Sequence, residues 1–198
     1  MGNSQDIDDI KDMEEQLEIE DKINVATQTL ERNIGFVTNC DNKASIVLTI
    51  VGVLLTIILT NDGLKEIFRI VNHCIEANTI GSKIYLLCFV IATGILILGI
   101  SKLGNVLVAK VSEKECEIEN RNSKIFFGDI QKKETCESYK KDFRIMKNTD
   151  LLDDLIEQIY INARIANLKY TKFNKGFKIT LIGFMLFVVV LIIGIYLY

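Results

Sequence analysis

The residue types that most often carry out chemistry are few in this sequence and stand far apart. The single histidine, His73, has no cysteine or carboxylate in metal-ligand spacing. The five cysteines are an odd number without a Cys-x-x-Cys pair, which fits neither a disulfide framework nor a zinc site. No nucleophile elbow, phosphate-binding loop or dinucleotide fingerprint occurs. The sequence therefore predicts no catalytic residue, no metal site and no cofactor.

One patterned set of small and hydroxyl-bearing residues lies in an uncharged run. Its members follow at spacings of four, three, four and four, which predicts a single face of one helix. They are Ser45, Thr49, Gly52, Thr56 and Thr60. In a membrane, such a face either packs against another helix, since small residues permit close approach, or lines a mildly polar pore in an oligomer. Both interpretations stay open.

The run that holds this face is one of three uncharged blocks, which are 44–61, 84–101 and 179–198. They predict three transmembrane helices at about 44–61, 84–103 and 179–198. Each block approaches or reaches the roughly 30 Å hydrocarbon core of a bilayer. The second extends past Lys102 if that side chain reaches toward the membrane surface. No charged residue lies inside the blocks, which argues against an ion-coupled transporter.

The distribution of Lys and Arg predicts the orientation of the chain in the membrane. Three basic residues lie between the first two blocks, whereas sixteen lie from Lys102 to Lys178. By the positive-inside rule, the N-terminus and residues 102–178 are cytoplasmic, the 61–83 loop is outside, and the C-terminus ends outside. The net charge of −3, without a dense basic stripe, predicts no nucleic-acid partner.

The remaining segments favour helices, because the chain has no proline to break them. An apolar stripe predicts one helix that continues from about residue 150 into the third block. Its members are Leu152, Leu155, Ile156, Ile159, Ala163, Ala166 and Tyr170. The segment 123–130 is expected to be a connector packed against the helices. The composition of the acidic tail, 1–26, favours disorder.

The expected fold is therefore an all-α integral membrane protein, in which three transmembrane helices continue as long cytoplasmic helices. The membrane domain covers residues 27–195, and its cytoplasmic helical region is about 104–178.

Two short motifs flank these helices in a distinctive order. An Asp-x-Lys-Ala signature opens the first membrane block, and the run 124–130 follows the second. The motif residues are Asp41, Lys43, Ala44, Phe127, Gly128 and Tyr139. Together with the membrane pattern, the order and spacing resemble the transmembrane effector family of the bacterial Pycsar anti-phage systems.

The resemblance implies a function. In such a system a cyclase makes cCMP or cUMP after infection, and the effector responds by impairing the membrane, which aborts the infection. The expected partners are thus a cyclic pyrimidine mononucleotide, membrane lipid and further copies of the chain. One phosphate and one base call for a basic group and an aromatic ring. The candidates are Arg121, Lys124, Phe126, Lys169 and Tyr170.

Two other functions remain as alternatives. A non-enzymatic membrane scaffold would recruit partners through its cytoplasmic helices without any ligand response. A membrane-bound enzyme would need a catalytic constellation, which the sequence does not offer.

Overall fold

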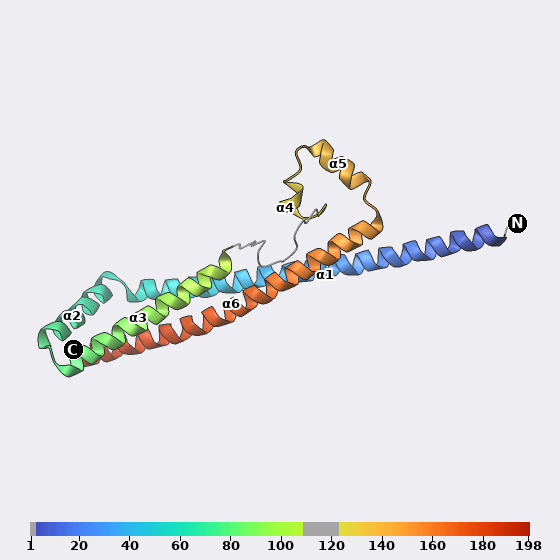
Figure 1. Cartoon of the computed structure of the whole chain (residues 1–198). Coiled ribbons are helices and arrows are strands. Elements are labelled where there is room, and N and C mark those ends of the chain that lie inside the picture. The colour runs from blue at the N-terminus through green and yellow to red at the C-terminus, as the bar shows by residue number, and fades with distance from the viewer. Residues whose placement is uncertain (1–2, 109–122) are drawn as a thin grey trace. The chain divides into compact units, whose positions relative to one another are not determined.

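The computed structural model describes residues 3–108 and 123–198, with side chains described from Met13 onward (Figure 1). All regular structure in these residues is helical, and they contain no strand. The helices are α1 (Asn3–Ile58), α2 (Asn61–Ala77), α3 (Ile80–Leu107), α4 (Phe127–Ile130), α5 (Cys136–Arg144) and α6 (Asn148–Leu197). The all-α fold is confirmed, and α1, α3 and α6 are long and apolar enough to cross a membrane.

The chain divides into two compact units. We call residues 1–37 and 110–167 the polar unit, and residues 38–109 and 168–198 the membrane unit. The two longest helices, α1 and α6, contribute residues to both. The expectation of one unbroken helix from about residue 150 into the third membrane block is confirmed, since α6 runs from Asn148 to Leu197.

The membrane unit is packed through small residues. Its largest core cluster joins buried residues of α1, α3 and α6, which are Val51, Ala92, Leu96, Phe187 and Leu191. A Cβ added at Gly183 would lie 2.6 Å from the backbone nitrogen of Leu96. One added at Gly99 would lie 2.5 Å from the backbone nitrogen of Thr180. These glycines therefore let α3 and α6 approach closely, as helices do where lipid provides no hydrophobic driving force.

The segment after the first membrane helix differs from the expected loop, because it forms α2. The hydroxyl of Thr60 accepts a hydrogen bond from the Gly63 N–H at 3.4 Å and caps the helix start. Ile70 and Cys74 are buried on one face of α2, and its apolar residues recur at helical spacing. The helix ends at Ala77 and is followed by Asn78, which has a left-handed φ of 45°.

The acidic tail also differs from the expected disorder, because α1 is helical from Asn3. From Ile19 onward, buried and partly buried positions recur at alternating spacings of four and three along this helix. They are Ile19, Ile23, Ala26, Leu30, Asn33, Val37, Cys40, Ala44, Val47 and Val51. We call this packed face of α1 its seam, because the three-four spacing is that of a coiled coil, and packing along such a face stabilises a helix that composition alone would not.

The predicted small-residue face of the first membrane helix has a mixed outcome. Thr60 lies beyond the end of α1 and caps α2 instead. Ser45, Thr49, Gly52 and Thr56 lie in α1 but are exposed, and nothing approaches within 4 Å of a Cβ built at Gly52. In the described chain this face therefore does not pack against another helix, and its role as an oligomer contact or a pore lining stays a prediction.

The close approach at Gly183 can be tested by adding one methyl group. We expect Gly183→Ala to lower the melting temperature of the purified protein in detergent, because overpacking typically costs about 1–3 kcal/mol. Gly94→Ala is the control, since a Cβ at Gly94 meets nothing within 4 Å. The packing argument fails if both variants melt together with the parent protein.

Candidate functional site

An ion pair joins α1 and α6 at one end of the membrane unit. The Lys169 Nζ lies 2.6 Å from both carboxylate oxygens of Asp41, and both side chains are partly buried. A charged pair that shares two short contacts resists exchange with water more than a surface pair does. The Asp-x-Lys-Ala motif thus supplies one half of a contact between helices 128 residues apart in sequence.

The other motif residues in this segment have different surroundings. Ala44 is fully buried and packs with Leu103 and Val106 of α3, so only a small side chain fits there. Lys43 is exposed. The motif therefore combines a polar contact to α6 through Asp41 with an apolar contact to α3 through Ala44.

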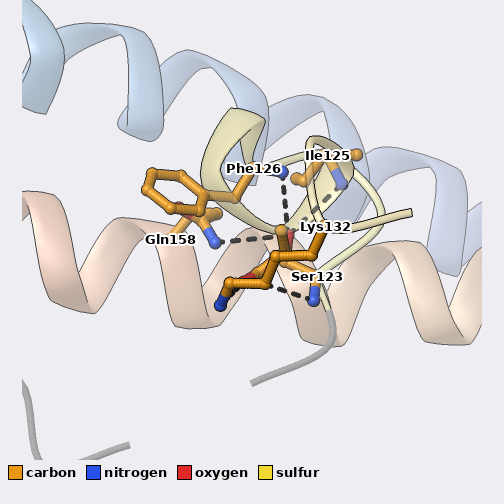
Figure 2. Close-up of polar contacts among 6 residues, drawn as sticks. Ser123, Ile125, Phe126, Lys132 and Gln158 are labelled. Carbon is orange, nitrogen blue, oxygen red and sulfur yellow. Dashed lines mark hydrogen bonds and ion pairs between the residues drawn. The ribbon is translucent and has the colours of Figure 1, made fainter. Parts of the chain in front are cut away.

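In the polar unit, a buried serine organises the segment before α4, as Figure 2 shows. The Ser123 hydroxyl accepts the backbone N–H groups of Ile125 at 3.2 Å and Phe126 at 2.9 Å. The Gln158 side-chain amide of α6 donates to the same hydroxyl at 3.4 Å. Both Ser123 and Gln158 are buried. This serine therefore folds the turn and fixes it to α6, as was expected of the 123–130 connector.

A buried carboxylate closes the same turn from the other side. Asp129 accepts the Ser123 N–H at 3.3 Å and the Lys132 ammonium at 2.9 Å. A buried carboxylate is tolerated only when such donors surround it. The aspartate of the Phe-Phe-Gly-Asp run thus stabilises the fold of this turn. A Cβ at Gly128 would lie 2.5 Å from the Phe126 ring, so this glycine leaves room for the aromatic side chain.

A second set of hydrogen bonds ties Lys124 to the unit. Its backbone N–H donates to Asp154 Oδ2 of α6 at 2.8 Å, and its carbonyl accepts the Tyr139 hydroxyl at 3.0 Å. The motif residue Tyr139 therefore anchors α5 to this connector. The other carboxylate oxygen of Asp154, Oδ1, is buried and has no hydrogen-bond partner in the described part of the chain.

The predicted ligand residues fall into both units. Lys124 and Phe126 lie in the polar unit, where the Lys124 ammonium is 4.0 Å from an Asp150 oxygen and the Phe126 ring packs on Phe127 at 4.7 Å. Lys169 and Tyr170 lie in the membrane unit. Arg121 lies outside the described residues. Because Asp41 already pairs with Lys169, a phosphate at that lysine would compete with a carboxylate. Nucleotide binding by these residues stays a prediction.

Sequence reasoning missed the residues that hold the polar unit together. Ser123, Gln158 and Asp154 are separated by up to 35 residues, and no spacing rule links a loop serine with a helix glutamine. The described residues contain no group of three or more metal-ligating side chains.

The fold and these contacts define a class: a helical membrane protein in which two long helices enter both a polar unit with a buried hydrogen-bond network and an apolar membrane unit. The sequence model of the Pycsar effector protein domain matches residues 25–196. The chain belongs to this family, the transmembrane effectors of Pycsar anti-phage systems. It is 31% identical over 179 residues to the Pycsar effector protein GmPycTM of Gulbenkiania mobilis, which covers 83% of this chain and 88% of that protein. No solved structure matches.

The ion pair can be tested with a charge swap. We expect Lys169→Met to lower the free energy of unfolding by about 1–3 kcal/mol, because it leaves the partly buried Asp41 carboxylate without its cation. The swapped variant, with Asp41→Lys and Lys169→Asp, should recover part of the loss in thermal unfolding in detergent. If the swap is as unstable as the sum of its two single variants, the pair does not act as a unit.

The buried serine gives a second test. We expect Ser123→Ala to expose residues 123–146 to limited proteolysis, since two backbone N–H groups and the Gln158 amide lose their shared acceptor. Ser138→Ala is the matched control, because Ser138 is exposed and its hydrogen bond to Thr135 uses the backbone N–H. Equal digestion rates for the two variants would contradict the anchoring role.

Proposed function

We propose that this effector binds a cyclic pyrimidine mononucleotide, cCMP or cUMP, and in response impairs the integrity of the inner membrane, so that infection is aborted before phage mature. In this proposal the protein carries out no reaction. The nucleotide shifts a conformational equilibrium, and the membrane helices perform the output.

The continuity of α1 and α6 is the observation that carries the proposal. Each is a single helix that contributes residues to both the polar and the membrane unit. A ligand shifts an equilibrium only by its difference in affinity for the two states. With helices shared between the units, a nucleotide that prefers one arrangement of the polar unit also changes the free energy of the membrane unit.

The proposed binding region is the connector around Lys124. Its ammonium offers a cation for the phosphate, and Phe126 offers a ring close by in sequence. The buried Asp154 Oδ1, which has no partner among the described residues, can accept a hydrogen bond from an N–H of the pyrimidine. Lys169 and Tyr170 are the alternative pair.

The proposed topology places the N-terminus and residues 102–178 in the cytoplasm and the C-terminus outside. It is supported by sixteen basic residues in that region against three between the first two membrane helices. Membrane impairment by a three-span chain is expected to need several copies. The exposed face of Ser45, Thr49, Gly52 and Thr56 supports this self-association, because small residues allow membrane helices to pack.

Co-expression with a cytidylate or uridylate cyclase tests the proposal. We expect a membrane-potential dye to report depolarisation with an active cyclase and none with a catalytically dead one. Asp154→Asn should weaken the response, while Asp153→Asn, on the exposed side of α6, should leave it unchanged. No depolarisation with either cyclase, at confirmed membrane expression, would contradict the proposal and favour a non-enzymatic membrane scaffold.

A further inference from the structure

An open groove runs between α1 and α6 in the polar unit. It has a volume of about 460 Å³ and a largely apolar lining, with charged residues along the α1 side. The lining residues are Glu18, Asp21, Lys22, Val25, Ala26, Thr29, Leu152, Ile156 and Ile159. Val25 is 63% exposed and Ile156 is 52% exposed, although both are large apolar side chains. In the described structure this surface thus remains open to solvent.

The groove coincides with an apolar stripe that the sequence marks for packing. Leu152, Ile156 and Ile159 belong to the stripe that predicts the α6 helix, yet the residues buried on α6 of the polar unit are Leu155, Gln158 and Ile161. The helix therefore has two usable faces. One is covered by its own chain. On the other, Ile156 is exposed while Leu152 and Ile159 are partly buried, which marks an apolar interaction surface.

A helix that matches the groove lies in the same unit. α5 is strongly amphipathic, yet none of its residues is buried. Its apolar side carries the Tyr139 and Phe143 rings, whose centroids are 5.9 Å apart. Phe143 is 48% exposed. In Figure 1, α5 stands clear of α1 and α6, so it does not occupy the groove of its own chain.

The charges of the two surfaces are complementary. The α1 segment 13–22 has five carboxylates and one lysine, and it contributes Glu18, Asp21 and Lys22 to the groove. Lys22 pairs with Glu18 at 2.7 Å, so the segment keeps a net negative charge. The rings of α5 are flanked by Lys140 and Arg144, and together they line a shallow hollow of about 200 Å³. Within α5, Asp142 is held by Lys133 at 2.8 Å, and this hydrogen bond lowers the pKa of its carboxyl. Lys140 pairs with Glu137 at 2.8 Å, whereas Lys141 and Arg144 stand outside both pairs. With three basic and two acidic residues, α5 offers a partner a net charge of +1.

We propose that the α1–α6 groove binds α5 of a second copy of this chain. The Phe143 ring enters the apolar floor at Val25 and Ile156, while Lys140 and Arg144 face the acidic rim. The contact is heterologous, because the groove of one copy meets a different surface of the next, and such contacts build rings or open chains. It rests on the self-association that the proposed function includes, and it names the surfaces that make it.

Cysteine cross-linking tests the contact directly in membranes. The native Cys88, Cys116 and Cys136 are first replaced by serine. Differently tagged chains with Val25→Cys and with Phe143→Cys are then co-expressed and oxidised. We expect a cross-link between the two tags, and a ladder beyond dimers when one chain carries both cysteines. The proposal would be overturned if no mixed cross-link formed, or if the double variant formed only intramolecular cross-links. Efficient dimers of the Val25→Cys chain alone would also overturn it.

Charge reversal distinguishes this specific contact from non-specific association of the chains. We expect Glu18→Lys with Asp21→Lys, or Lys140→Glu with Arg144→Glu, to reduce the mixed cross-link roughly tenfold, because like charges then face each other. A chain carrying all four changes should recover it, and Glu31→Lys, elsewhere on α1, should leave it intact. No recovery in the four-fold variant, with its thermal unfolding unchanged, would overturn the pairing.

The readout needs no cyclase or toxicity, so the two proposals can fail separately. Cross-links that form while neither cCMP nor cUMP depolarises cells would support the contact and contradict the proposed function. Depolarisation without mixed cross-links, measured with and without each nucleotide, would support the proposed function and contradict the contact.

Discussion

The structure depends on one constraint: α1 and α6 are unbroken helices whose shared seam must hold in two different solvents. Without proline, neither helix has a forced stop between its polar and its membrane residues. In the polar unit, burial of apolar surface from water drives the seam together. In the membrane unit that force is absent, because lipid is as apolar as the side chains, so close packing has to replace it.

The residues of the seam follow this change of solvent. In the polar unit, Asn33 donates its side-chain amide to the Ile159 carbonyl at 3.2 Å, a polar contact of the kind that fixes register in coiled coils. In the membrane unit, Ala44 and Gly183 bring backbones close instead. The Asp41–Lys169 pair lies in the charged parts of both helices, which precede the uncharged runs in the sequence. It fixes which turn of α1 faces which turn of α6.

Much of the fold could be predicted from the sequence, because membrane insertion and helix continuity each require a pattern of residue types that is visible along the chain. Uncharged runs predict the membrane helices, and the absence of proline predicts their continuation, as α6 confirms. For the acidic tail, 1–26, the composition favours disorder, and a composition argument ignores the three-four repeat through Ala26 and Asn33, which is visible in the sequence. The helix α2 was missed because a short segment between two transmembrane helices was expected to be a loop. Its N-cap, Thr60, and the helical spacing of its apolar residues predict a helix instead.

The site was less predictable, for a physical reason. The hydrogen bonds of Ser123 and the Lys124–Asp154 contact join residues far apart in sequence, and a serine or aspartate looks the same whether it is solvated or buried. The roles of the motif residues were not predicted, since Asp41 contacts a lysine 128 residues away and Tyr139 contacts a backbone carbonyl.

The buried network also limits how the polar unit can change its conformation. Ser123, Asp129 and Gln158 each form hydrogen bonds with polar groups that would otherwise be buried without a partner. Breaking one of these contacts alone therefore costs free energy, which favours keeping the connector intact. Asp154 is the exception, because one of its oxygens is buried without a partner in the described residues. An incoming donor at that oxygen would remove a desolvation cost that the described arrangement carries. A bound donor there would therefore change the balance between α6 and its connector. α6 continues without a break into the membrane unit, so in the proposed function this balance would connect nucleotide binding to the membrane helices.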